Sequence, residues 1–200
     1  MKQKKGFKWG ILIAVLLIIL LGVIVAVATV NYSIQRERTR AEDAALDAEG
    51  WALYNRIMDR DLVNDYPQTP EAVMDFFNWT SYFIYSRPPK DPEAVLRVLM
   101  RQRELYTPEF LALNVLELQF EHLLESLEEL HERQIFSTDI SRSASYFYDP
   151  ANDHVAVIST TIYLTGSPGS FNRDFYFVWV EPPGGALGRG RWKIEGWRES

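Results

Sequence analysis

The stretch DHVAVISTTIYLTGSPGSFNRDFYFVWVE, from Asp153 to Glu181, decides the fold of this chain. On either side of its centre the residues follow a period of two, which is the pattern of half-buried β-strands. The central GSPG, which begins at Gly166, combines glycine and proline in the manner of a turn. The stretch therefore predicts two antiparallel strands joined by a turn.

Two further stretches with the same period extend this pair. DISRSASYFYD begins at Asp139, and RWKIEGWRE begins at Arg191 after the glycine-rich PPGGALGRG. Four strands joined by turns predict an antiparallel meander. In strict alternation Trp197 lies on the face opposite Trp192, whereas a bulge at Gly196 would return Trp197 to the inner face.

The residues before Gln134 predict helices. The tripeptides TPE at Thr69, DPE at Asp91 and TPE at Thr107 each supply an N-cap, a proline at the first helical position and a glutamate in the first turn. We expect helices over 70–86, 92–105 and 108–133. Helices followed by strands indicate an α+β fold class, in which the helices pack on the concave face of a curled four-stranded antiparallel sheet to form a cone.

The run ILIAVLLIILLGVIVAVATV, Ile11 to Val30, is uncharged and long enough to cross a bilayer as a helix. Lysines precede it, and by the positive-inside rule they favour a cytoplasmic N-terminus. The alternative is a signal peptide cleaved after Ala28, because Ala26-Val27-Ala28 has the small-x-small form of a cleavage site. The run exceeds the usual apolar core of a signal peptide, so we expect an uncleaved, single-pass cell-membrane protein.

This topology predicts four parts of the chain. They are a cytoplasmic basic tail over 1–10, a transmembrane helix over 11–30, a helical stalk over 31–50 and an extracytoplasmic α+β domain over 51–200. The stalk is charged and alanine-rich, with few large apolar groups, so it needs little packing. From Trp51 onward apolar residues recur at helical spacing and are expected to dock on the domain.

Charge and composition exclude several classes of function. The net charge is −6, and the four lysines before the apolar run contribute +4, so the remaining chain carries −10. Phosphate contacts need clustered Lys and Arg, so we exclude direct nucleic-acid binding. No cysteine is present, and His122 and His131 lie nine residues apart, on opposite sides of one helix. We therefore expect no metal and no cofactor.

Catalysis has little support in the sequence, and we assign no catalytic residue. Asp139 and Asp174 lie in predicted strands. A carboxylate there could act as a general base if burial raised its pKa, but a surface carboxylate is the simpler interpretation. Aromatic residues in SYFYD and DFYFVWV are the candidates for lining a pocket inside the cone. The candidate ligand-binding residues are Tyr146, Tyr176, Trp179 and Trp192.

One helix carries a feature that favours a protein partner. Glutamates recur along the helix expected over 108–133, and like charges at this spacing each cost a few tenths of a kcal/mol. They are therefore not there to stabilise the helix. A solvated face is one interpretation, and a patch that meets a basic partner is the other. The candidate partner-binding residues are Glu117, Glu121, Glu125, Glu128 and Glu132.

The order of these parts resembles that of TraE-type conjugation proteins. The shared plan is a basic tail, a single span, a helical stalk, helices that open with TPE or DPE, and a late strand meander. The resemblance implies a nuclear transport factor 2-like domain, and the ending GRWKIEGWRES, 190–200, is similar to the final strand of many such domains. It also implies kinship with the inner-membrane bridging subunit of type IV secretion systems. Membrane proteins associated with actinobacterial lipid import have a similar plan. Here all helices precede all strands, unlike in some of these relatives.

From these patterns we predict a membrane-anchored, non-catalytic scaffold or assembly subunit of a bacterial cell-envelope machine, such as a conjugative secretion system. Its expected partners are the lipid bilayer, through residues 11–30, and envelope proteins. The binding surfaces would be the acidic helix, the sheet face or a self-association surface that makes a homo-oligomer. The alternative is an extracytoplasmic domain that binds a small apolar ligand in its cone, or an accessory protein of lipid import. Large aromatic residues more often fill a small core than leave it hollow, so this alternative ranks second.

Overall fold

The computed structural model describes residues 31–32, 34–38, 47–86, 90–143, 154–166, 169–181 and 190–199. The chain divides into two compact units, 1–45 and 46–200. In the first unit the described residues are helical, and they are exposed to solvent. The expected basic tail and the apolar run over 11–30 lie outside the described residues.

The expected fold class needs correction. Of the helices in the described ranges, none is both long enough and apolar enough to cross a membrane. The longest of them has 17 residues, and six of these are glutamates. The expected transmembrane helix is therefore absent from the fold that the described residues form. The observed fold is α+β, with an open sheet of antiparallel strands that follow the helices in the chain.

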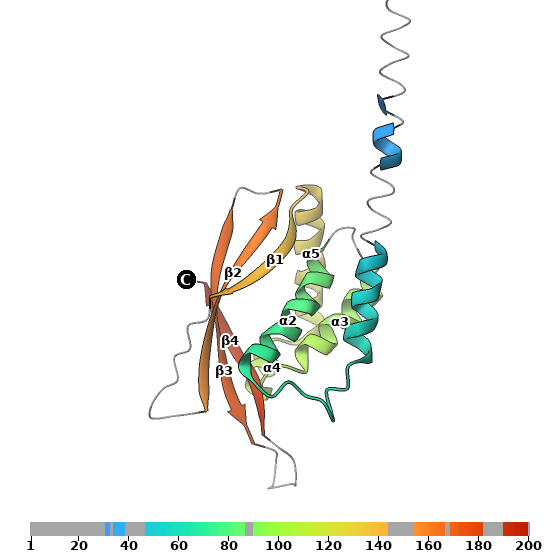
Figure 1. Ribbon diagram of the computed structural model, residues 1–200. Coiled ribbons are helices and arrows are strands. Elements are labelled where there is room, and N and C mark those ends of the chain that lie inside the picture. The colour runs from blue at the N-terminus through green and yellow to red at the C-terminus, as the bar shows by residue number, and fades with distance from the viewer. Residues whose placement is uncertain are drawn as a thin grey trace, which may run out of the picture. The chain divides into compact units, whose positions relative to one another are not determined.

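The helices come first in the chain and the strands follow. Residues 47–59 are helical, and the helices after them are α2 (Pro70–Tyr85), α3 (Pro92–Arg103), α4 (Pro108–Leu113) and α5 (Leu116–Glu132). The strands are β1 (Phe136–Ser143), β2 (Val155–Thr165), β3 (Ser170–Val180) and β4 (Arg191–Glu199). The labelled helices lie on one side of the sheet (Figure 1). The face toward these helices is therefore the inner face, and none of the labelled helices covers the other face.

Local chemistry explains where two of the helices begin. The Thr69 hydroxyl accepts a hydrogen bond from the Ala72 amide at 3.2 Å, and the Thr107 hydroxyl accepts one from the Phe110 amide at 3.1 Å. Both threonines are thus N-caps, as their sequence motifs predict. Asp91 makes no side-chain capping bond, although a proline follows it at the first helical position of α3.

The single helix expected over 108–133 is two helices. The first helix ends at Asn114, whose φ of −121° and ψ of 76° are not helical. Arg103 stabilises this break, because its Nη1 donates to the Asn114 carbonyl at 2.6 Å and also to the Gln119 side chain. A contact between residues this far apart in the chain has no signature in a helical period. For that reason the periodicity of the sequence did not reveal the break.

The strands pair in the order β1-β2-β3-β4, each antiparallel to the next. In the last pair the register shifts by one residue, so that Phe177 pairs with Ile194, Tyr176 with Gly196 and Phe175 with Trp197. The extra residue is a β-bulge in β4. The bulge places Trp197 on the inner face, where its ring centroid lies 5.7 Å from that of Phe175.

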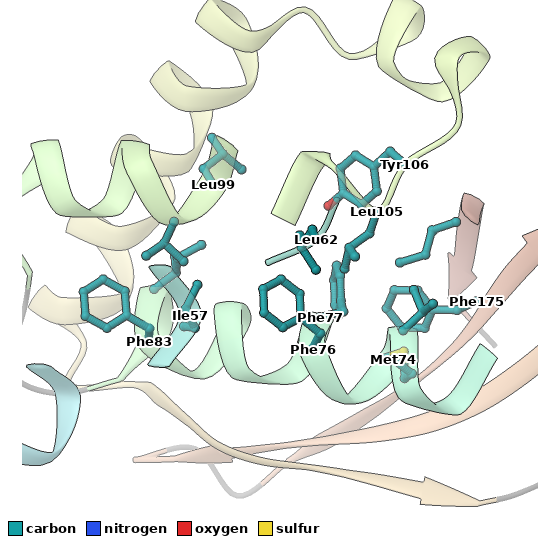
Figure 2. Packing of buried hydrophobic residues seen from close by; sticks show 14 of the residues in the cluster. Ile57, Leu62, Met74, Phe76, Phe77, Phe83, Leu99, Leu105, Tyr106 and Phe175 are labelled. Carbon is teal, nitrogen blue, oxygen red and sulfur yellow. The ribbon is translucent and has the colours of Figure 1, made fainter. Parts of the chain in front are cut away.

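The core lies between the inner face of the sheet and α2. Figure 2 shows Phe77 of α2 and Phe175 of β3 among the buried residues of this layer. Their ring centroids are 5.0 Å apart in an edge-to-face arrangement, and Phe175 is fully buried. On the other side of α2, residues 47–59 pack Ile57 into the same cluster. Helix α2 is therefore the central element, covered on both sides.

The outer edge of β4 is covered by the segment between α3 and α4. The Ile194 amide donates to the Leu105 carbonyl at 2.8 Å, and the Thr107 amide donates to the Ile194 carbonyl at 3.0 Å. These bonds satisfy backbone groups that would otherwise be open to another strand. They also hold Tyr106 against the sheet, where its ring meets Trp197.

Candidate functional site

A cavity of about 440 Å³ lies between the helices and the inner face of the sheet. Its walls come from α2, α3 and α5 on one side and from β2, β3 and β4 on the other. This volume is within the range of small-molecule sites in proteins. The apolar part of its lining consists of Phe77, Ile84, Leu99, Leu123, Leu130, Ile135, Ile162, Leu164, Phe171 and Trp197.

A buried polar network forms one part of the wall. The Gln102 amide nitrogen donates to the Thr80 hydroxyl at 2.9 Å and to the Ser81 hydroxyl at 3.0 Å. Its oxygen accepts a hydrogen bond from the Tyr106 hydroxyl at 3.1 Å. All four side chains are buried. Gln102 thus satisfies three partners at once and holds α2, α3 and the segment before α4 together.

Arg173 is the charged residue of β3 that lines the cavity. Its Nη2 donates to Glu199 at 3.2 Å, while its Nε is buried with no hydrogen-bond partner among the described residues. The guanidinium carbon lies 5.2 Å from the centre of the Phe171 ring and 5.6 Å from that of Trp197. Two aromatic rings therefore hold the guanidinium beside the cavity through cation–π contacts.

Two tyrosines of the cavity wall stay protonated at neutral pH. Burial raises the pKa of Tyr85, against the opposing effect of Arg173. Burial also raises the pKa of Tyr106. Both hydroxyls are therefore hydrogen-bond donors across the physiological range.

The mouth of the cavity lies along α5. His122 and Ser126 line the cavity and are exposed, whereas Leu123 and Leu127 on the same helix are buried. The apolar stripe of α5 thus faces inward, as its spacing predicts. In the described lining of the cavity there is no aspartate or glutamate. A carboxylate that could act as a base toward a bound molecule is thus missing from that lining.

Three of the sequence-predicted ligand residues lie in the described ranges, and all three are outside the cavity lining. Trp179 and Trp192 pack against each other, with ring centroids 5.6 Å apart at 71°. The Tyr66 hydroxyl donates to the Trp192 carbonyl at 2.8 Å, which fixes this end of the sheet. Tyr176 alternates with the buried Phe175 and Phe177 and lies on the outer face. Tyr146 lies outside the described residues.

The predicted partner-binding glutamates are all exposed on α5. Glu117, Glu121, Glu125, Glu128 and Glu132 follow the side of the helix opposite its buried leucines. Glu129 on the same helix pairs with Arg133 at 3.1 Å. We call the five predicted glutamates the acidic ridge. The structure brings them together on one helix face and keeps them away from the cavity.

The carboxylates considered for catalysis lie elsewhere. Asp174 is on the outer face of the sheet, where it accepts a hydrogen bond from Ser159 at 2.7 Å and lies 3.8 Å from Arg198. Nothing is described of the Asp139 side chain. Within the described ranges no group of three or more His, Cys, Asp or Glu is placed to hold a metal ion. The loop that begins at Asp61 is an Asx turn, in which the Asp61 carboxylate accepts hydrogen bonds from the backbone amides of Val63 and Asn64.

Lys193 on β4 is an unusual lysine that the sequence did not single out. Its ammonium group lies 4.7 Å from the centre of the Tyr66 ring and donates to the Glu104 carbonyl. Burial, together with the charge of Arg191, lowers the pKa of Lys193 to about 8. Because the ordinary value is 10.5, the folded state disfavours the charged form.

This shift predicts a pH-dependent stability difference for Lys193→Met. Below pH 8 the lysine is charged in both states, so its full electrostatic cost to the wild type is present. Between pH 8 and 10.5 the unfolded state binds more protons than the folded state, and the wild type gains stability as the pH rises. Urea unfolding should therefore show the advantage of Lys193→Met over wild type shrinking across this window. The control is Arg198→Met at an exposed position, for which the difference in free energy of unfolding from wild type should not change with pH. A difference for Lys193→Met that also stays constant between pH 8 and 10.5 would contradict the lowered pKa of Lys193.

The residues that carry the site were mostly missed by sequence reasoning. Arg173 shares the alternation of Phe175 and Phe177, so a charged residue on an apolar strand face was a signal in the sequence. Gln102 and Ser81 have no such signal, because their partners are distant in the chain. His122 was considered only as a metal ligand.

Comparison with family models matches residues 1–197 to a family described as a domain of unknown function (DUF6715). Comparisons with curated proteins and with solved structures returned no match. The description of the matching family contains no activity, ligand or partner.

Proposed function

This chain belongs to the DUF6715 family, and we propose that its folded domain binds a small apolar molecule in the cavity between its helices and its sheet. The apolar run over 11–30 holds the domain at a cell membrane, with the domain on the outer side. The domain is a binding module and not an enzyme. Its ligand reaches the cavity from the α5 side.

The observation that carries this proposal is the cavity itself. A small domain normally packs its interior to the density of an organic crystal, with few voids larger than a water molecule. A space of about 440 Å³ lined mainly by aliphatic and aromatic side chains is a departure from that rule. An apolar ligand would restore the missing contacts, while the described lining offers neither a metal site nor an acidic side chain.

The test is photolabelling of the full chain in phosphatidylcholine nanodiscs with a diazirine-bearing dodecanol. Labelled peptides should come from α5, β2 and β3. Leu130→Trp combined with Leu164→Trp fills the cavity from two walls and should lower labelling of those peptides at least about tenfold, equivalent to about 1.4 kcal/mol of binding. The matched control is Glu128→Trp with Tyr163→Trp, which places the same rings on exposed neighbouring positions. Equal labelling in both double variants would overturn the proposal.

The acidic ridge favours a second candidate function, that of a scaffold or assembly subunit of a cell-envelope machine. Five glutamates on one exposed helix face oppose helix stability through like-charge repulsion. A basic partner protein would neutralise them. This function agrees with the resemblance to TraE-type conjugation proteins, and it does not require the cavity.

Charge reversal tests the scaffold function. In-cell crosslinking of the tagged full chain should capture an envelope protein, and Glu121→Lys with Glu125→Lys and Glu128→Lys should abolish that capture. Since the three side chains are exposed, we expect the free energy of unfolding to change by no more than about 0.5 kcal/mol per site. Capture that persists in the triple variant would exclude the ridge as the binding surface.

A further inference from the structure

We propose that the cavity selects a single-chain amphiphile with an anionic head group, and that the head binds Arg173 and Tyr85 while the alkyl chain fills the apolar part. This inference rests on the proposed function and specifies its ligand class. It is carried by the unequal distribution of charge and polarity around the cavity.

The charges of the cavity wall are of one sign. Arg173 lines the cavity, and among the described lining residues there is no acidic side chain to compensate it there. Its nearest described counter-ion is Glu199, whose side chain is 75% exposed at the end of β4. Glu199 is therefore a weak, solvent-screened partner that an incoming anion can replace.

Arg173 also has an unused donor. Its Nε is buried without a hydrogen-bond partner among the described residues, although a buried donor of this kind is normally satisfied. A carboxylate or phosphate oxygen at this position would accept from Nε, and a second oxygen would accept from Nη2 in place of Glu199. Phe171 and Trp197 contact the guanidinium through their rings, so the group is held beside the cavity before the ligand arrives.

Tyr85 supplies a second donor on the opposite wall. It lines the cavity from the end of α2, and it is close enough to Arg173 for the two to interact electrostatically. A neutral phenol hydroxyl beside a guanidinium is a suitable pair for an anion. The rest of the lining, from Leu123 and Leu130 on α5 to Ile162 on β2, is apolar and matches an alkyl chain.

The test compares ligands that share one chain and differ in the head. In nanodiscs, dodecanoate, dodecyl phosphate and dodecanol compete with the diazirine-bearing dodecanol for the full chain. Wild type should bind the two anions at least about tenfold more tightly than dodecanol, because a charged hydrogen bond in a buried site is stronger than a neutral one. Whichever anion binds more tightly distinguishes a carboxylate head from a phosphate head, and either result supports the inference.

Three variants separate the inference from the proposed function. Arg173→Met should lower the ratio of anion affinity to dodecanol affinity to about one, and Arg173→Lys should restore part of that ratio. Glu199→Gln, at an exposed position, should tighten anion binding a few-fold because it removes the competing carboxylate. If Arg173→Met and Glu199→Gln both bind the anions as tightly as wild type does, and dodecanol still binds, the inference is overturned while the proposed function stands. If the diazirine-bearing dodecanol does not label wild type in the cavity, the proposed function is overturned, and this inference with it.

Discussion

Replacing Phe175 with alanine should lower the free energy of unfolding by about 3 to 5 kcal/mol, the range for a large aromatic residue removed from a packed core. Phe175 is fully buried. Its ring meets Phe77 of α2 at 5.0 Å and Trp197 of β4 at 5.7 Å, so it connects the central helix to two strands. A cavity left at this point cannot collapse easily, because aromatic rings surround it on both sides.

Urea unfolding of the full chain in nanodiscs, followed by tryptophan fluorescence, measures this loss. The matched control is Tyr176→Ala, the next residue in the strand, which lies on the outer face and is only partly buried. We expect Tyr176→Ala to cost about 1 kcal/mol or less. Similar losses for both variants would mean that the inner and outer faces of β3 are assigned wrongly.

Gln102→Leu should cost about 2 to 3 kcal/mol although leucine has a similar size. The substitution removes the acceptor of the Tyr106 hydroxyl and the donor to Thr80 and Ser81. Thr80 keeps its bond to the Phe77 carbonyl at 2.7 Å, whereas Tyr106 is left with a buried hydroxyl whose described partner is gone. A buried polar group without a partner loses its full hydration energy.

A double-mutant cycle isolates this contribution. Tyr106→Phe removes the hydroxyl that Gln102→Leu leaves unsatisfied, so the double variant should be more stable than the sum of the two single losses predicts. Urea unfolding of the four proteins gives the coupling energy. Strict additivity would contradict a direct bond between the two side chains.

The helix starts could be predicted because they depend on neighbours in the chain. Thr69 and Thr107 cap the helices that follow them, as three consecutive residues indicate. The division at Asn114 depends on Arg103, a contact between distant residues, so it could not be predicted. The bulge in β4 lies between these cases, since Gly196 marks its place in the sequence and only the pairing with β3 decides that it forms.

The candidate site was harder to predict for a related reason. Trp179 and Trp192 were predicted to line a ligand pocket. Two large rings on neighbouring strands can instead pack against each other, and these two do so in an edge-to-face contact. A cavity exists where apolar residues from several elements fail to fill the space between them. That failure depends on the distance between helix and sheet, which local sequence patterns do not contain. Arg173, a charged residue between the aromatic residues of β3, was a signal in the sequence that our prediction did not use.

The most direct measurement of the central claim is a crystal structure of the full chain grown in a lipid phase with an ω-bromo fatty alcohol. The account predicts an anomalous bromine peak inside the cavity, between Leu130 of α5, Ile162 of β2 and Trp197 of β4. A cavity closed by its own side chains, with bromine only in the surrounding lipid, would contradict it.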